Sequence, residues 1–289
     1  MIDTVIQLLA SGLLVGGMYA LTATGLTLVM GVMRLVNVAH GVFFTLGGYL
    51  TFAGLSLLGL NFFLAVPLAG VGAGVVAALV ERTMVRRVRR DELRVVILTL
   101  ALAFVGQEAL RVIFGGKPKS LPAFTGQSLL IGSVSLEGQR VVVFGLALVL
   151  IAALYLLVRY TRWGMALRMV AQDREAALLV GINTDVVFML TFGIGALVAG
   201  LAGGLMGPIN LISPAMGWNP LLVSFAAVVL GGMGSIWGTV LAGLLLGVIE
   251  LFSGFFINPS MGTISSLLVL IAVVVARPTG LFGQDVRGG

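Results

Sequence analysis

The sequence predicts an all-α membrane protein, a polytopic bundle of about eight transmembrane helices, within a range of about seven to nine. Of its 289 residues, 59% are hydrophobic and 10% are charged, and the mean hydropathy is +1.15. Soluble domains carry about 25% charged residues, so this chain has too few to cover a surface that faces water. Apolar segments of about 20 residues, long enough to cross a bilayer as helices, recur along its whole length.

Nine segments are candidates for these helices. They lie near 5–31, 36–58, 62–80, 94–114, 141–158, 187–207, 220–236, 238–257 and 263–276. The segments 220–236 and 238–257 are separated only by a tight turn, so we expect one of the last three to be partial or re-entrant. No second domain is indicated, and residues 1–289 are expected to form a single transmembrane domain.

The arginines predict the orientation of the chain in the membrane. Basic residues gather in two segments, 81–94 and 159–174, and in the C-terminal tail; they are Arg82, Arg86, Arg87, Arg89, Arg90, Arg94, Arg159, Arg162, Arg168, Arg174, Arg277 and Arg287. Loops rich in arginine stay on the cytoplasmic side. This places Arg34 inside and the N-terminus outside. The N-terminus has no basic region and no small-residue cleavage site, so the first apolar segment is expected to be a permanent span.

Several functional classes are excluded by the residues present. The chain has no cysteine and one histidine, which rules out disulfides and Cys-based metal sites and predicts no metal and no cofactor. The sequence G-x-x-x-x-G-K-[ST] does not occur, because Pro118 follows Gly116 and Lys117, so the chain has no P-loop for ATP. The net charge of +6 belongs to loops between apolar segments, and a nucleic acid is therefore not an expected partner.

Many of the 41 glycines lie within apolar segments at a spacing of four residues. Such pairs allow helix backbones to approach closely in lipid. Helix packing is the expected role of Gly12 and Gly16, Gly70 and Gly74, Gly200 and Gly204, Gly203 and Gly207, and Gly243 and Gly247.

A charged, helix-forming segment, 171–183, interrupts the apolar chain. Asp173 suits the N-cap of a helix, Glu175 suits the first turn, and Gly181 suits the end. The segment predicts an amphipathic helix of two to three turns in a cytoplasmic loop. Such a helix either transmits movement from a soluble partner to the bundle or lies on the lipid headgroups.

Three stretches resemble branched-chain amino acid permeases of the LivH type, the membrane subunits of ABC importers. They are "GLTLVMGVMRLVNVAHGVFFTLGGYL" (25–50), "VVLGGMGSIWGTVLAGLLLGVIE" (228–250) and "ARPTGLFG" (276–283). In addition, Glu175-Ala176-Ala177 followed by Gly181 resembles the E-A-A-x-x-x-G signature of the cytoplasmic helix that docks into the ATP-binding subunit. The resemblance covers nearly the whole chain and implies that Asp173, Arg174, Glu175, Ala176, Ala177 and Gly181 couple it to that subunit.

The resemblance also implies partners and a location. The chain would lie in a bacterial or archaeal inner membrane, in the lipid bilayer, with a second similar permease subunit, two ATP-binding subunits and an extracytoplasmic solute-binding protein. It would carry leucine, isoleucine or valine and would have no ATPase site of its own.

Polar residues and glycines within the apolar segments are candidates for the translocation path. These candidates are Asn37, His40, Gly41, Gly47, Gly48 and Glu250. A helix weakened by glycine near Asn37 and His40 would point backbone N–H groups toward a central cavity. Alternatively, Asn37 caps the second helix while His40 hydrogen-bonds a neighbouring helix. Glu250 is a functional candidate because an intramembrane carboxylate is costly, or else a hydrogen-bonded structural residue of the bundle.

Two other functions stay open. The same kind of importer could carry urea, an amide, another amino acid or a sugar. A secondary transporter driven by an ion gradient would need paired intramembrane acids or a proton relay, and Glu250 is the one deep carboxylate that the sequence offers.

Overall fold

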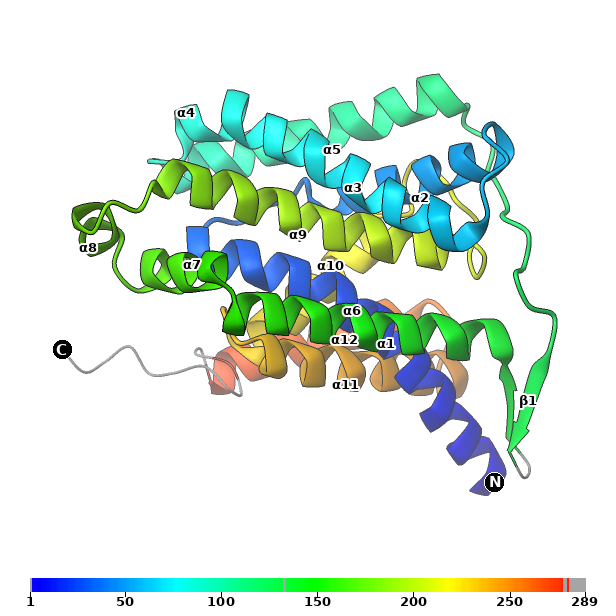
Figure 1. The fold of residues 1–289 in the computed structure, drawn as a ribbon. Helices are drawn as coiled ribbons and strands as arrows, with labels where there is room; N and C mark the ends of the chain where they lie inside the picture. Colours follow the sequence, from blue (N-terminus) through cyan, green and yellow to red (C-terminus); the bar gives the residue numbers. More distant parts are fainter. Residues whose placement is uncertain (1, 132–133, 278–279, 281–289) are drawn as a thin grey trace.

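The computed structural model describes residues 2–131, 134–277 and 280, and most of these residues are helical. Figure 1 shows the helices running side by side in one bundle. In chain order they are α1 (Ile2–Met33), α2 (His40–Ser56), α3 (Phe62–Val80), the π-helical turn η1 (Glu81–Val85), α4 (Arg86–Val88), α5 (Glu92–Phe114), α6 (Gly138–Tyr160), α7 (Arg162–Gln172), α8 (Arg174–Leu179), α9 (Thr184–Met206), α10 (Trp218–Gly231), α11 (Ile236–Phe256) and α12 (Met261–Ala276).

Each of the nine predicted apolar segments forms a helix, but the helices differ in length. Among the described residues, six helices are long and apolar enough to cross a membrane: α1, α3 with its continuation through α4, α5, α6, α9 and α11. The other three, α2, α10 and α12, have 17, 14 and 16 residues. At about 1.5 Å per residue, such helices are shorter than a hydrocarbon core of about 30 Å.

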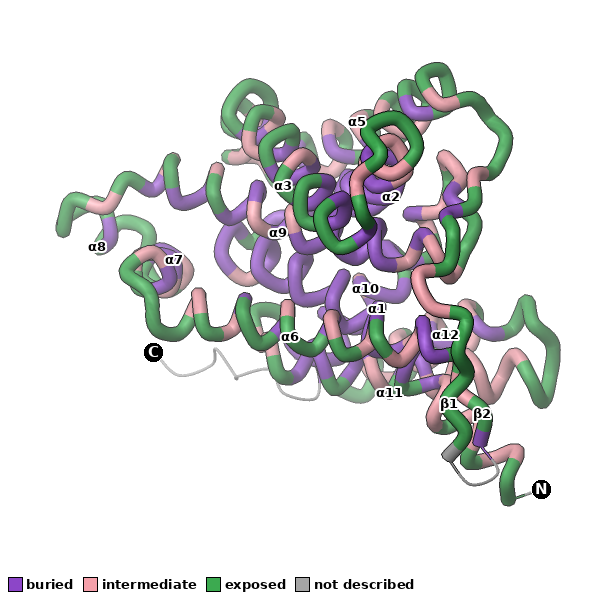
Figure 2. Tube along the Cα trace, turned by 45° about the vertical axis from the view of Figure 1, so that its right-hand side comes forward, coloured by how far each residue is buried: buried purple, intermediate pink, exposed green. Residues whose placement is uncertain are grey.

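The centre of the bundle is formed by α1 and α9. These are the most buried of the six long helices, while α5 and α6 are the least buried. Figure 2 shows the same division, with buried residues along α1, α9 and α10 and exposed residues along α5 and α6. Because α5 and α6 are strongly apolar yet exposed, their outer surfaces suit lipid.

Glycines bring the central helices into close contact, as the four-residue spacing predicts. A Cβ added to Gly247 would lie 2.3 Å from the Cα of Gly16, and one added to Gly12 would lie 2.7 Å from the Cα of Val248. The contact between α9 and α3 is similar, since a Cβ on Gly200 would lie 3.3 Å from the Cα of Gly70. The prediction that these glycines pack helices is confirmed, except for Gly207, which faces the side chains of Leu121 and Ile212 outside the helices.

The two ends of the bundle have different characters. One end carries α4, α7 and α8, so the arginine-rich segments 81–94 and 159–174 lie at the same end, as predicted; the N-terminal end of α1 lies at the other (Figure 1). We refer to these as the cytoplasmic and outer ends, following the arginine distribution. Of the predicted cytoplasmic tail, Arg287 lies outside the described residues, as does part of the segment 276–283.

The outer segment between α5 and α6 contains a β-hairpin. Strands β1 (Ser128–Ile131) and β2 (Val134–Glu137) pair antiparallel, with Ser128 opposite Glu137. The Gln7 amide of α1 bonds the β2 backbone, donating to the Ser135 carbonyl at 2.7 Å and accepting from the Ser135 N–H at 2.9 Å. The hairpin is therefore fixed to the start of the first helix.

Candidate coupling and translocation sites

The charged segment forms the helix α8, which projects from the cytoplasmic end of the bundle (Figure 1). Asp173 is its N-cap, as predicted: one carboxylate oxygen accepts from the N–H of Glu175 at 2.8 Å and from the N–H of Ala176 at 3.0 Å. Gly181 follows the helix with φ +83°, a conformation that favours glycine and ends helices. Both terminal signals seen in the sequence thus act as predicted.

The helix is shorter than predicted. It contains six residues, Arg174 to Leu179, which is less than two turns, whereas the sequence predicts two to three turns within 171–183. Ala171 and Gln172 belong instead to α7, a separate helix that the sequence interpretation does not contain. The two helices are divided at Asp173, whose extended backbone (φ −146°, ψ 110°) interrupts the helical path.

One face of α8 packs on the bundle and the rest is exposed. Ala177 is buried, while Arg174, Glu175 and Ala176 are exposed. Leu179 is 89% exposed and Val180 is 64% exposed. Apolar side chains this exposed at the tip of a projecting loop are typical of a surface that a partner covers.

An open cavity of about 380 Å³ lies beside α8. The ends of α1, α7 and α8 enclose it, and Arg34, Asp173, Arg174, Glu175 and Phe188 are among its lining residues. Arg34 has φ +53° and its guanidinium donates to the carbonyl of Ala171 at 3.4 Å. The coupling candidates therefore adjoin the segment that leads from α1 into α2.

Ion pairs connect the segment after α3 to the start of α9. The Asp185 carboxylate binds both Arg86 and Arg89, and Arg89 also lies 3.4 Å from the carboxylate of Glu81, which is buried. The Arg89 guanidinium stacks 4.9 Å from the Phe188 ring centroid. The sequence interpretation misses this network, because it assigns the arginines only to membrane orientation; Asp185, an acidic residue in the first turn of α9, was the available signal.

The start of α2 lies inside the bundle, beside the start of α10. Residues 34–37 are not helical, and α2 begins at His40. A Cβ on Gly41 would lie 2.7 Å from the carbonyl oxygen of Gly217, the N-cap of α10. The positive ends of the dipoles of α2 and α10 therefore meet at one place.

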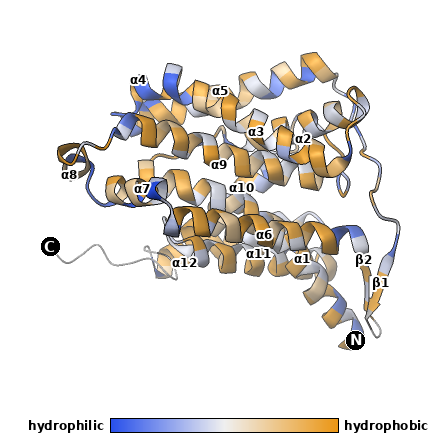
Figure 3. Ribbon diagram, in the orientation of Figure 1, coloured by the Kyte–Doolittle hydropathy of each residue, from blue (hydrophilic) through white to orange (hydrophobic). Residues whose placement is uncertain are grey.

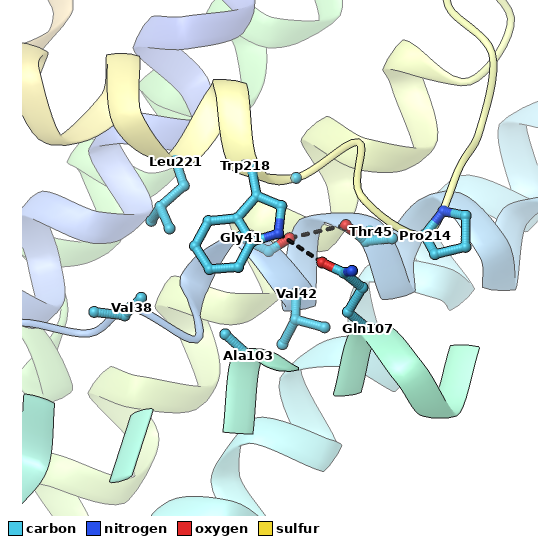
Figure 4. A pocket seen from close by; sticks show the side chains of 10 residues that line it. Val38, Gly41, Val42, Thr45, Ala103, Gln107, Pro214, Trp218 and Leu221 are labelled. Carbon is cyan, nitrogen blue, oxygen red and sulfur yellow. Dashed lines mark hydrogen bonds between the residues drawn. The ribbon is translucent and has the colours of Figure 1, made fainter. Parts of the chain in front are cut away.

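A small cavity lies at this meeting point (Figure 4). Its volume is about 10 Å³, room for about one water molecule, so this conformation is closed to an amino acid here. Gly41, Thr45 and Ala103 line it, and the indole N–H of Trp218 donates to the Gln107 side-chain oxygen across it at 2.6 Å.

Asn37 and His40 are buried beside α1. His40 Nε2 is 3.1 Å from the carbonyl oxygen of Thr22 in α1, which confirms the predicted bond to a neighbouring helix. The alternative in which Asn37 caps α2 is wrong, because Ala39 is the N-cap and makes no side-chain cap. Both polar atoms of the Asn37 amide, and His40 Nδ1, are buried without a hydrogen-bond partner among the described residues. Buried polar groups of this kind are rare in native proteins.

The remaining path candidates lie elsewhere. Gly47 packs against Gly200 of α9, and Gly48 packs against the Met216 side chain. Glu250 lies on α11 beside Tyr19 of α1, and its Oε2 atom is buried without a hydrogen-bond partner among the described residues. Since Tyr19 and Thr22 are one helical turn apart, Glu250 and His40 contact the same part of α1 but do not form one site.

These features define a multi-pass helical membrane protein, with a short helix that projects from its arginine-rich end and short helices, α2 and α10, that begin inside the bundle. A sequence profile of the family described as branched-chain amino acid transport system / permease component matches residues 8–274. The chain therefore belongs to this family of permeases.

Individual proteins are similar over almost the whole chain. The high-affinity branched-chain amino acid transport system permease protein LivH of Escherichia coli is 33% identical, covering 96% of both chains. The corresponding permease BraD of Pseudomonas aeruginosa is 32% identical, also covering 96% of both chains. Among solved structures, PsaBC from Streptococcus pneumoniae in complex with Fab has a similar fold, with a TM-score of 0.52 and 13% identity over 95% of both chains.

Proposed function

We propose that this chain is the permease subunit of an ATP-driven importer that carries leucine, isoleucine or valine across the cytoplasmic membrane of a bacterium or archaeon. The observation that carries the proposal is the identity of 33% with LivH over 96% of both chains. The partners are a second similar permease, two ATP-binding subunits and an extracytoplasmic solute-binding protein. ATP is hydrolysed by the ATP-binding subunits, and this chain catalyses no covalent step.

The coupling site in this proposal is α8 with its two flanking residues. Asp173 fixes the start of the helix and Gly181 its end, while Arg174, Glu175, Ala176 and Ala177 form the helix between them. The exposed apolar tip at Leu179 and Val180 supports contact with a soluble subunit. Closure of the ATP-binding subunits would move α8, and the ion pairs of Asp185 would carry this movement to α3 and α9.

The translocation path in this proposal passes the adjoining starts of α2 and α10, near Gly41. Separation of these helices would widen the cavity beside Thr45 and Gln107 and expose helix N-termini to the substrate carboxylate. The unpartnered amide of Asn37 and Nδ1 of His40 support this, because water or substrate would supply the missing hydrogen bonds. Gly47 and Gly48 keep α2 close to its neighbours, and Glu250 lies beside Tyr19 in the contact between α11 and α1.

The test is uptake of radiolabelled leucine by proteoliposomes that contain the whole complex, with ATP inside and loaded binding protein outside. One variant carries Glu175→Arg and Gly181→Pro; Glu108→Arg, an exposed carboxylate at the outer end of α5, is the control. We expect ATP-dependent uptake in the wild type and in the control, and a loss of tenfold or more in the α8 variant with the complex still assembled.

Two results would change the proposal. Uptake that ignores ATP and follows an imposed proton or sodium gradient would overturn it in favour of a secondary transporter. Absence of leucine uptake, with ATPase activity stimulated by a binding protein loaded with another solute, would retain the importer and replace its substrate.

A further inference from the structure

A second cavity at the cytoplasmic end is strongly basic. It is open, with a volume of about 650 Å³, and lies between α4, α8 and the start of α9. Of the described residues, five arginines line it together with one carboxylate, that of Asp185; the arginines are Arg86, Arg87, Arg89, Arg90 and Arg174. Retention of loops in the cytoplasm requires only that basic residues be present, and does not require five of them to converge on one cavity.

The positive charge of this cavity is only partly neutralised. Asp185 is shared by Arg86 and Arg89. Within the part of the chain that the structure describes, Arg87 and Arg90 have no carboxylate partner, and both are exposed. The nearby Asp91 is paired with Arg94 at 2.9 Å. An anion in the cavity would therefore find free guanidinium groups.

The helical segments on both sides of these arginines carry exposed apolar side chains that suit lipid chains. Met84 is 45% exposed and Leu93 is 68% exposed, on the helical segments that directly precede and follow the arginines. These segments continue into α3 and α5, whose outer faces are apolar and exposed. Figure 3 shows the hydrophilic residues of α4 next to the hydrophobic residues of α3 and α5. Exposed arginines and exposed apolar side chains thus occur close together in the segment 84–93.

We propose that this cavity binds the phosphate group of an anionic phospholipid from the inner leaflet. Guanidinium groups bind phosphate oxygens through paired hydrogen bonds, and basic pockets at the cytoplasmic side of transmembrane helices bind acidic headgroups. The acyl chains would lie along α3 and α5, beyond Met84 and Leu93. An acidic surface of a partner protein would use the arginines alone, whereas a lipid would use both the arginines and the exposed apolar side chains near them.

A lipid bound in this cavity would also affect the coupling site. Arg174 belongs to α8, whereas Arg87 and Arg90 follow η1, so one phosphate would bridge the two elements. A bound lipid would hold α8 near α4 without any new protein contact. The binding itself does not depend on the proposed transport function.

The experiment is native mass spectrometry of the purified full-length chain titrated with phosphatidylglycerol, with zwitterionic phosphatidylcholine in parallel. The test variant is Arg87→Gln with Arg90→Gln. The matched control is Arg159→Gln with Arg162→Gln, two exposed cytoplasmic arginines outside the cavity. Because the test variant removes two positive charges that attract the anionic headgroup, we expect it to bind phosphatidylglycerol about 30-fold more weakly than the wild type. Phosphatidylcholine should bind weakly to all three.

Three results would overturn the proposal. An equal loss in the control variant would show that general charge, and not this cavity, attracts the lipid. Displacement of phosphatidylglycerol by millimolar inorganic phosphate, which then binds alone, would identify a soluble phosphate as the ligand. Unchanged lipid binding by the test variant, with loss of co-purification with the ATP-binding subunit, would assign the arginines to that protein instead.

Discussion

The contact between α1 and α11 and the contact between the segment Glu81–Arg89, which follows α3, and the start of α9 are held together by different means. In the first, glycines bring the backbones together: Gly12 and Gly16 face Val248 and Gly247. In the second, Asp185 binds two arginines and Glu81 lies behind them. Lipid chains are as apolar as the helices that they surround, so the hydrophobic effect does not drive these helices together. Close packing of the backbones therefore stabilises the first contact. Ion pairs contribute to the stability of the second contact, which lies where the helices leave the membrane.

The largest effect should follow from a methyl group added inside the glycine contact. In Gly247→Ala the new Cβ would lie 2.3 Å from the Cα of Gly16 and displace the two backbones. We expect the free energy of unfolding to fall by about 3 kcal/mol, measured by denaturant titration in detergent micelles. Gly145→Ala is the control, because no atom lies within 4 Å of its added Cβ. Equal stability of the two variants would show that the α1–α11 contact is not fixed by backbone approach.

Removal of the Asp185 carboxylate should have the next largest effect on stability. Asp185→Ala leaves Arg86 and the largely buried Arg89 without this partner. Hydrogen bonds to charged groups contribute about 1.5–3 kcal/mol each, so we expect a loss of about 2 kcal/mol in the same unfolding assay. Glu108→Ala, which breaks an exposed pair with Arg111, should cost less than about 1 kcal/mol. If the two losses in stability are equal, the ion pairs of Asp185 contribute no more than an exposed surface ion pair.

A smaller, local effect should follow from loss of the α8 cap. Asp173→Ala removes two hydrogen bonds to backbone N–H groups and should destabilise α8 by about 1 kcal/mol. Hydrogen exchange of the amides in 174–179 should become about fivefold faster. Asp173→Asn keeps the cap oxygen and should restore slow exchange; failure of this variant to do so would mean that the charge, and not the cap, orders the helix.

The smallest effect should come from the polar contact within the membrane. The hydroxyls of Thr27 and Thr239 are 2.7 Å apart across the α1–α11 contact. Hydrogen bonds between transmembrane helices contribute about 0.6 kcal/mol on average, so Thr239→Val should lower the free energy of unfolding by about this amount. Thr83→Val, which removes a hydroxyl bonded to its own helix, should have almost no effect. A loss for Thr239→Val as large as that for Gly247→Ala would contradict the dominance of packing in this contact.

Features that depend on local composition could be predicted from the amino-acid sequence alone. Hydropathy located all nine helical segments, the arginines placed 81–94 and 159–174 at one end, and four-residue spacing identified the packing glycines. Asp173, Gly181 and the pair of Glu108 with Arg111 were also predictable, because a cap, a helix end and an i, i+3 pair involve neighbours in the chain.

The meeting of distant residues, in contrast, depends on the tertiary structure. Asp185 binds arginines that are 96 and 99 positions away, and Gly41 meets Gly217. Three further features also depend on how neighbouring helices constrain the backbone. They are the shortness of α8, the separate helix α7, and the start of α2 without a cap from Asn37. Every long helix here is apolar on several faces, so hydropathy identifies the spans but not their neighbours; the close approach of particular backbones selects them.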